Sequence, residues 1–463
     1  MSEAKQIPLS CGQLQLWVLE QLAPGKAGYN VTDAMRVRGP LDPDRLERSL
    51  GELARRHEGL RACFRVQDGH PVQQIREAVK VDFVRSDLAK VPAAEREAEA
   101  RRIAARVSNQ PIDLGQAPLW MVHSIQLEPE EHWVVLVIHH IVFDGWSAAL
   151  FWEGLIEVYE RAARGSCGGD SAEPGQISAF VEWELEQLRG ERLGELLGYW
   201  KQKLAGSLPV LELPVDFVRP EQASFRGGKR SLEMPTDLAR RLRELARRAQ
   251  TTFFTALLAA YKVFLYRYTN QEDMIVGTPF ATRSGPGHET ILGFLVNTLV
   301  LRSRMQGEQS FLEFLADVRA TSVEAYDHGD LPFHRLVDAI QPERTAGSNP
   351  LFQTMFQVNG QREMPTGETG ISLEPLVLES EFSTFDLTLE VLETRSGLLL
   401  RMEYAADLFL PETIERLLQN YLFLLEQIVA NPEARISDLG VVCADETTRL
   451  LEVFSRESSG LKT

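Results

Sequence analysis

Two adjacent histidines and a nearby aspartate stand out in the stretch IHHIVFDGWS, which runs from Ile138 to Ser147. Asp144 follows His140 by four residues, and the triplet Gly-Trp-Ser comes directly after it. Histidine can bind a metal, assist a nucleophile or move a proton near neutral pH, and it can also be a hydrogen-bonded core residue. The stretch could therefore serve metal binding, nucleophilic catalysis, proton transfer or structure alone.

The residues before the histidines argue against a metal. The apolar run from Val134 to Ile138 predicts a strand that is buried on both faces. Side chains alternate along a strand, so His139 and His140 are expected to point to opposite sides. Two such residues cannot easily hold one ion, and no other His or Cys cluster in the sequence has the spacing of metal ligands. The sequence therefore predicts no metal site.

The residues after the histidines favour acyl transfer. A helical pattern follows Asp144, and Gly145 stands at its start. Amide groups at a helix N-terminus stabilise developing negative charge, and a glycine there lets a substrate approach the backbone closely. The sequence has no GxSxG motif and no cysteine placed for activation. The remaining chemistry is attack of a substrate amine or hydroxyl on an acyl thioester, beside a histidine that accepts or orients its proton.

Length and charge narrow the classes of function. A chain of 463 residues is too long for one ordinary core, so two lobes or domains are expected. The formal net charge of -17 argues against nucleic-acid binding, which needs a basic surface. The four cysteines have no CxxC spacing, which fits a reducing cytoplasm. The N-terminus lacks a signal-peptide pattern, and no apolar run is long enough to span a membrane.

Helix and strand patterns alternate along the chain. The loop RGSCGGDSAEPGQ, residues 164–176, is the candidate boundary between two lobes, 1–175 and 176–445, and the polar residues 446–463 are expected to begin a linker to a following domain. The expected helices are 12–22, 42–55, 93–109, one after Asp144, 177–189, 192–204, 236–248, 251–267, 309–326 and 411–428. The expected strands are 29–39, 61–66, 73–76, 119–127, 132–140, 273–279, 294–304, 350–358, 384–392 and 397–404.

Several segments together resemble the condensation domains of non-ribosomal peptide synthetases. HHIVFDG matches the HHxxxDG signature of that family. The segments similar to its other motifs are, in order, LSCGQLQLWVLEQL (9–22), RRHEGLRACF (55–64), SAFVEWE (178–184), LGFLVNTLVLR (292–302), HGDLPFHRLV (328–337) and RTAGSNPLFQTMF (344–356). The first of them departs from the usual form at Cys11-Gly12 and at Leu14-Gln15, where Arg usually follows. The order and spacing hold over residues 7–445.

The resemblance implies both a subtype and a fold. Heterocyclization domains replace the two histidines with aspartates, and epimerization domains lack the FVNT and NPLF patterns, so condensation is the best match. The implied fold is α/β (α+β), with two chloramphenicol-acetyltransferase-like lobes that form a V-shaped pseudo-dimer around a central tunnel. Donor and acceptor carrier proteins bind on opposite faces, and their phosphopantetheine arms meet at the second histidine. No tightly bound cofactor is implied.

The resemblance also assigns roles to residues. His140 is expected to orient the attacking amine or accept its proton, and His139 is expected to be structural. Asp144 is similar to the family's structural aspartate, and its expected partner is Arg283 of VGTPFATRSG, from the second lobe. The amide of Gly145 is the candidate donor to the oxyanion.

Further residues are expected along or beside the substrate tunnel. Trp146 and Ser147 are expected to line or support it, and Asn297 is expected near it, in the segment that crosses between the lobes. Ala148 and Ala149 are small and could leave room for an acyl chain, although alanine there also simply favours helix.

The start of the chain suggests a subtype and a set of partners. If Met1 is native, the resemblance implies a starter condensation domain, which joins a fatty acyl group from acyl-CoA or an acyl carrier to the first aminoacyl thioester of a lipopeptide. An internal elongation domain with a peptidyl carrier donor, and an idle domain that only recruits partners, are the alternatives. The expected partners are an acceptor peptidyl carrier protein, a downstream adenylation domain, and acyl-CoA or a donor carrier protein. We expect a monomer in the cytoplasm.

Overall fold

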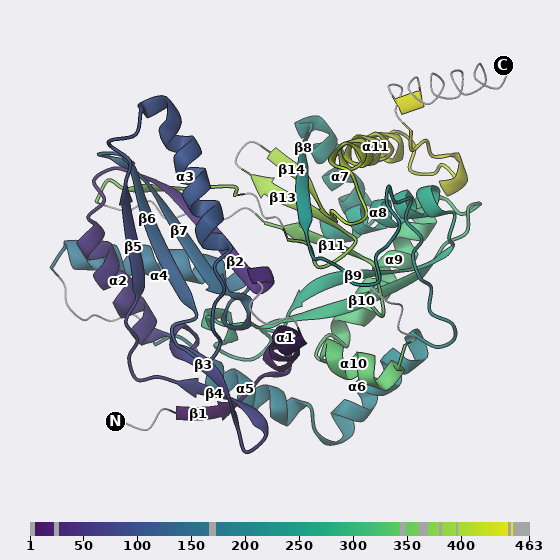
Figure 1. Cartoon of the computed structure of the whole chain (residues 1–463). Coiled ribbons are helices and arrows are strands. Elements are labelled where there is room, and N and C mark those ends of the chain that lie inside the picture. The colour runs from purple at the N-terminus through teal and green to yellow at the C-terminus, as the bar shows by residue number, and fades with distance from the viewer. Residues whose placement is uncertain are drawn as a thin grey trace.

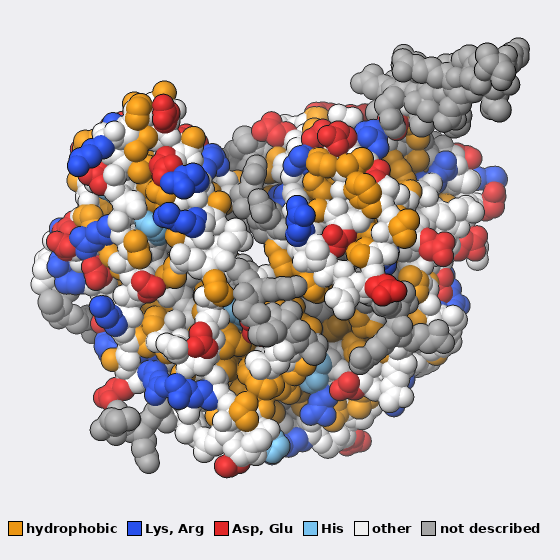
Figure 2. Space-filling model, viewed as in Figure 1, with side chains coloured by type: hydrophobic (Ala, Val, Ile, Leu, Met, Phe, Trp, Pro, Cys, Tyr) orange, Lys and Arg blue, Asp and Glu red, His pale blue; other side chains and the backbone are white. Residues whose placement is uncertain are grey.

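The computed structural model describes residues 5–22, 27–165, 173–342, 349–360, 369–378, 382–394, 397–442 and 446–447. Most of the predicted boundary loop and of the predicted C-terminal linker lies outside these ranges. The two halves of the chain lie side by side, each built around a sheet, and a notch separates them at the top of the view (Figures 1 and 2). Within the described ranges, no helix is both long and apolar enough to cross a lipid bilayer.

The first half contains a five-stranded and a three-stranded sheet. The strand order is β12-β2-β7-β6-β5 in the larger sheet and β1-β4-β3 in the smaller one. In the larger sheet β5 and β6 are parallel, and the other neighbouring pairs are antiparallel. The strands are β1 (Lys5–Pro8), β2 (Asn30–Arg38), β3 (Ala62–Gln67), β4 (His70–Ile75), β5 (Asp82–Asp87), β6 (Trp120–Glu128), β7 (Glu131–His139) and β12 (Ser372–Pro375). The helices are α1 (Cys11–Leu22), α2 (Pro43–Arg56), α3 (Ala93–Ser108) and α4 (Gly145–Ala163).

β7 lies in the middle of the five-stranded sheet and separates two cores. Its odd-numbered residues from Trp133 to Val137 belong to an apolar cluster with residues of α3. Its even-numbered residues from Val134 to Ile138 belong to a second cluster with residues of α2 and α4. This alternation is that of a strand covered on both faces. The predicted doubly buried strand is therefore confirmed, and it carries the histidine pair to the edge of the core.

The second half is built on a six-stranded sheet of order β10-β9-β11-β13-β14-β8. β11 is parallel to both of its neighbours, and the other pairs are antiparallel. The strands are β8 (Gly227–Met234), β9 (Asp273–Ala281), β10 (Val296–Arg304), β11 (Thr354–Asn359), β13 (Leu387–Thr394) and β14 (Gly397–Ala405). The helices that follow the first half are α5 (Ile177–Gln187), α6 (Gly190–Lys203), α7 (Thr236–Arg248), α8 (Phe253–Thr269), α9 (Phe311–Asp327), α10 (Phe333–Ile340) and α11 (Pro411–Ala430).

Segments from the second half of the sequence cross back to the first half. β12 pairs with β2 and so forms the edge of the first sheet. Ile291 and Leu295 belong to the apolar core that contains α2 and α4. Just before β12, the backbone N–H and hydroxyl of Thr369 donate to the buried carboxylate of Glu160 in α4. The boundary at residue 175 stays a prediction, and these contacts show that the chain returns to the first half beyond it.

Most of the expected helices and strands are present, with ends shifted by a few residues. The elements that the sequence patterns did not predict are β1, β5, β8, α10 and β12. β5 and β8 are edge strands with many polar residues, and β8 begins with two glycines, so neither shows the apolar alternation of a half-buried strand. Strand β11 begins at Thr354 rather than at the expected residue 350.

Candidate active site

The histidine pair lies where β7 ends. His139 is the last residue of the strand, and His140 begins a short 3-10 turn that leads to α4. The prediction that strand alternation separates the two histidines is therefore wrong in its reason, because His140 has already left the strand. The turn nonetheless gives the two imidazoles different surroundings.

The imidazole of His140 is held in one orientation by the backbone. Its Nδ1 donates to the carbonyl oxygen of Phe143, since a carbonyl can only accept, so Nε2 carries the lone pair in the neutral ring. The ring packs edge-on against Phe294, with 4.9 Å between the ring centroids. Burial lowers the pKa of His140, although the bond to Phe143 and the charge of Asp144 act in the opposite direction. The neutral form, with Nε2 as an acceptor, is thus favoured near neutral pH.

His139 is buried and faces other partners. Its Nδ1 accepts the backbone N–H of Ile141 at 3.1 Å, which leaves the proton of the neutral ring on Nε2. That nitrogen faces the carboxylate of Glu20 in α1, 3.8 Å away. The ring of Tyr29 lies nearby, with 6.4 Å between the centroids. These contacts place His139 in support of the turn.

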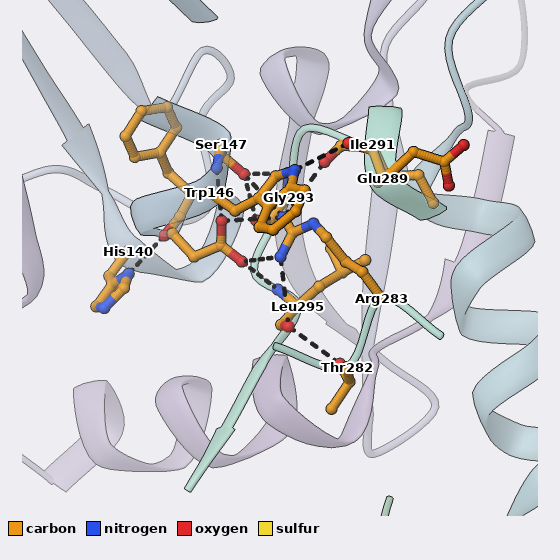
Figure 3. Close-up of polar contacts among 11 residues, drawn as sticks. His140, Trp146, Ser147, Thr282, Arg283, Glu289, Ile291, Gly293 and Leu295 are labelled. Carbon is orange, nitrogen blue, oxygen red and sulfur yellow. Dashed lines mark hydrogen bonds and ion pairs between the residues drawn. The ribbon is translucent and has the colours of Figure 1, made fainter. Parts of the chain in front are cut away.

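Asp144 and Arg283 form a buried ion pair between the two halves (Figure 3). Nη1 of Arg283 donates to Oδ2 of Asp144 at 2.7 Å, and Nη2 donates to Oδ1 at 2.9 Å. The carboxylate also accepts the backbone N–H groups of Ser147, at 2.8 Å, and Leu295, at 3.0 Å. The bond from Ser147 caps α4. The structure thus brings the two predicted partners together, in a bidentate geometry that fixes the start of α4 against the loop after β9.

His140 lies apart from this ion pair. In Figure 3 its side chain points away from Arg283, whereas Trp146 and Ser147 lie beside the guanidinium. The residues around Arg283, among them Trp146 and Ser147, thus form a cluster that is separate from the imidazole of His140.

Two predicted tunnel residues lie in packed surroundings instead. The hydroxyl of Ser147 donates to the carbonyl of Gly293 at 2.7 Å and accepts its N–H at 3.0 Å, and the residue is fully buried. Ala148 is buried in the core of the first half. Helix α4 turns both side chains toward protein. The structure therefore corrects the expectation that Ala148 leaves room for an acyl chain, and it leaves Ser147 only the supporting part of its expected role.

Trp146 covers the ion pair from outside. Its ring lies over the guanidinium of Arg283, 5.5 Å from the ring centroid, and its Nε1 donates to the carbonyl of Glu289 at 2.9 Å. Beside it, Gly145 is exposed, and a Cβ built there would meet no atom within 4 Å. Space is therefore open next to the first residue of α4.

Asn297, another predicted tunnel residue, lines a small cavity. Its Nδ2 donates to the carbonyls of Gly329 and Leu331, and its Oδ1 accepts the N–H of Phe333. The cavity has a volume of about 70 Å³ and shares Phe294 with the contact surface of His140. Its other lining residues include Gly12, Gln15, Glu184, Thr298, Asp330, Phe333 and His334.

Glu184 gives the small cavity a weakly acidic group. Its carboxylate accepts the backbone N–H of Cys11 at 2.7 Å, and burial raises its pKa to about 7. One signal for Glu184 was present in the sequence, because this residue ends the segment that resembles the fourth motif. Nothing in the sequence indicated the contact of Glu184 with the start of α1.

A larger cavity of about 960 Å³ adjoins the small one between the two halves. α1, α10 and segments around residues 219–225, 349–353 and 383–386 form its wall. Figure 2 shows hydrophobic side chains gathered in this middle region, around α1. The two cavities share Gln15, Thr298, Phe333 and His334. Sequence reasoning singled out none of these as cavity residues, because the helices and strand that carry them are distant in sequence.

Within the described ranges, no three His, Cys, Asp or Glu side chains come together in a way that could hold a metal ion.

Comparison with known families identifies the chain. Residues 3–451 match the family model of the condensation domain. The chain belongs to the condensation-domain family. Condensation domains are acyltransferases that form amide bonds in non-ribosomal peptide synthesis. One polypeptide of the linear gramicidin synthase of Brevibacillus parabrevis is 39% identical over 98% of this chain, but the match covers only 9% of that protein.

Further relatives and structures agree with this assignment. Phosphinothricin tripeptide synthetase PhsC of Streptomyces viridochromogenes is 37% identical over 96% of this chain and 41% of that protein. This condensation domain therefore spans less than half the length of these two relatives. The X-domain from teicoplanin biosynthesis has a TM-score of 0.85 and 26% identity, covering 96% of this chain and 99% of that one.

A solved condensation domain gives the same fold. The first condensation domain of the calcium-dependent antibiotic synthetase, in complex with a substrate analogue, has a TM-score of 0.79 at 23% identity, covering 95% of this chain and all of that one. The predicted α/β fold class is thus confirmed.

Proposed function

We propose that this condensation domain forms an amide bond by attack of an acceptor amine on an acyl thioester, beside His140. The observation that carries the proposal is the orientation of this imidazole. Its Nδ1 donates to Phe143, which leaves Nε2 as the acceptor, and burial lowers its pKa so that the lone pair is available near neutral pH. An acceptor of this kind orients an amine by taking one of its N–H bonds.

The proposed step forms one C–N bond and breaks one C–S bond. The amine nitrogen attacks the thioester carbonyl carbon, and the electron pair of the C=O bond moves to oxygen. Collapse of this intermediate restores the carbonyl and expels the thiolate. His140 Nε2 accepts the N–H of the attacking nitrogen, and the proton that the nitrogen loses ends on the leaving thiolate.

The amide of Gly145 is the proposed donor to the oxyanion. It is the first residue of α4, where the helix dipole favours negative charge. The open space beside its Cα supports this role, because a carbonyl group can approach there without meeting a side chain.

The two adjoining cavities are the proposed passage for one substrate arm. Phosphopantetheine on a carrier protein is a long flexible thiol, and the larger cavity offers a mostly apolar path toward the small cavity beside Phe294. An acceptor carrier protein, a donor carrier protein and an adenylation domain are the proposed partners. The relatives support this, because this domain covers only a fraction of each synthetase that it matches.

The donor is proposed to be carrier-bound, as the similarity to polypeptides of large synthetases favours. A starter domain that transfers a fatty acyl group from acyl-CoA is the alternative. Ala148, one of the two small residues that suggested that alternative, is buried in the core of the first half and so offers no support for it, whereas Ala149 is half-buried.

A single mass-spectrometric experiment tests the function. The protein is incubated with an aminoacyl carrier protein as acceptor and, in separate arms, a peptidyl carrier protein or octanoyl-CoA as donor. The proposal predicts an amide on the acceptor in the peptidyl arm, and the starter alternative predicts it in the octanoyl-CoA arm. If no arm gives an amide across several acceptor amino acids, the catalytic proposal fails.

A recruiting role is the second candidate. The X-domain of teicoplanin biosynthesis, solved in complex with OxyB, is 26% identical to this chain with a TM-score of 0.83. That likeness favours a domain that binds a partner protein. The absence of product in every arm above, together with a stable complex with a neighbouring enzyme, would support it.

A further inference from the structure

Helix α1 has two sides that meet different parts of the molecule. Gln13 and Glu20 are one heptad apart, so they lie on the same side of the helix, and both are buried. The residues of the opposite side line the larger cavity, and they are Leu14, Gln15, Val18 and Leu19. One helix therefore forms both the wall of the cavity and the support behind it.

Gln13 holds the turn that contains His140. Its Nε2 donates to the carbonyl of Ile141, the residue after His140, at 3.3 Å. The same amide exchanges hydrogen bonds with Gln73, and its Oε1 accepts the N–H of Ser10. Gln13 is fully buried, so water cannot replace these bonds when one of them is lost.

Glu20 lies beside His139, which bonds to the same turn. The N–H of Ile141 donates to Nδ1 of His139, and Nε2 of His139 faces the Glu20 carboxylate at 3.8 Å. Ile141 is thus held at its carbonyl by Gln13 and at its N–H by His139. In the chain, His140 lies between His139 and Ile141, which are bonded to one another. The imidazole of His140 therefore has little freedom to turn.

The surroundings of His139 also reach the cavity. Tyr29 lies 6.4 Å from His139 between ring centroids, and it lines the larger cavity. A substrate arm in this cavity contacts α1 and Tyr29, which are the elements that surround the histidine turn. The state of the His140 ring is therefore the quantity that reports on this link.

We propose that α1 positions His140, with Gln13 and Glu20 as positioning residues that act through Ile141 and His139. The proposal deepens the proposed function and rests on it for the role of His140. It gives the segment LSCGQLQLWVLEQL a task at the active site, and it places His139 in the alignment of its neighbour.

The test compares isosteric variants on one helix. Gln13→Glu removes the donor to Ile141, and Glu20→Gln removes the charge that faces His139. Gln21→Glu is the matched control, because Gln21 is exposed on the same helix. Each purified protein is checked by thermal melting and treated with diethyl pyrocarbonate, and carbethoxylation of His140 is followed by peptide mass spectrometry. Amide formation is measured in parallel with the carrier-bound substrates.

The proposal predicts faster carbethoxylation of His140 in Gln13→Glu, because the released ring leaves its packing against Phe294. Amide formation falls by about tenfold or more in that variant, as expected for a misplaced reacting group. Glu20→Gln shifts both quantities in the same direction by a smaller factor, and Gln21→Glu changes neither.

Two results would overturn the proposal. One is that folded Gln13→Glu and Glu20→Gln behave like Gln21→Glu in both measurements. The other is a fall in amide formation while the carbethoxylation rate of His140 is unchanged, since the residues would then not act through that ring. If Gln13→Glu does not fold, Glu20→Gln decides alone. If the wild type forms no amide, the proposed function fails, and the carbethoxylation rates still decide the positioning role.

Discussion

The guanidinium of Arg283 binds the carboxylate of Asp144 through two N–H groups, at 2.7 and 2.9 Å, and both side chains are almost fully buried. Arg283 follows β9 in the second half, and Asp144 caps α4 in the first. The pair therefore joins the two halves directly behind Gly145, and in it Arg283 bonds to the residue that caps α4.

Substitution of Arg283 is expected to destabilise the fold strongly. Arg283→Met leaves the Asp144 carboxylate buried without its counter-ion, and the free energy of unfolding should fall by about 3–5 kcal/mol in a denaturant titration. Arg304→Met is the control, because Arg304 pairs with Asp273 at an exposed position, and it should change stability by about 0.5 kcal/mol or less. Equal effects of the two variants would contradict the structural role of the buried pair.

Gly145→Ala separates the oxyanion role from folding. The added methyl group meets no atom within 4 Å, so the melting temperature should stay close to that of the wild type. The methyl group occupies the space proposed for the substrate carbonyl, and the rate of amide formation should fall by about tenfold or more. Gly194→Ala, an exposed glycine in α6 with equally open surroundings, is the matched control. Full activity of Gly145→Ala would remove Gly145 from the site.

Lys262 predicts a measurable pH dependence of stability. It is fully buried in α8, donates to the carbonyl of Leu301 and the hydroxyl of Ser303, and burial lowers its pKa to about 7. Between this pKa and the ordinary lysine value near 10.4, the unfolded chain binds more protons than the folded one, so this contribution to stability rises with pH.

Lys262→Met should abolish that contribution. The difference in unfolding free energy, wild type minus variant, should increase between pH 7 and pH 10 by at most about 1.4 kcal/mol per pH unit. Lys201→Met, at an exposed position of α6, should show no such slope. A flat difference for Lys262→Met across this range would show that the buried amine keeps its ordinary pKa.

The sequence predicted the parts of the site that depend on local pattern. The apolar run before His139 marked a doubly buried strand, and Gly145 after Asp144 marked the start of a helix; both are present. The partner of Asp144 came only from the family resemblance, because nothing local relates it to Arg283, which lies in the other half of the sequence.

The remaining errors have physical causes. His140 leaves the strand because its turn is closed by hydrogen bonds, including one between its own ring and the carbonyl of Phe143, which residue alternation does not reveal. Ala148 was placed in the tunnel without knowing which side of α4 faces the core. The contact of Gln13 with the histidine turn was missed because its bond to Ile141 links segments that are far apart in sequence.

The most direct test of the account is the amide-forming activity of His140→Ala, measured on protein whose melting temperature and circular dichroism match the wild type. The imidazole takes part in no buried ion pair within the described ranges, so the variant should fold. The rate of amide formation should fall by about a hundredfold or more, the usual effect of losing a group that accepts a proton or orients a nucleophile. A folded His140→Ala protein with nearly normal turnover would contradict the central claim that this imidazole acts on the attacking amine.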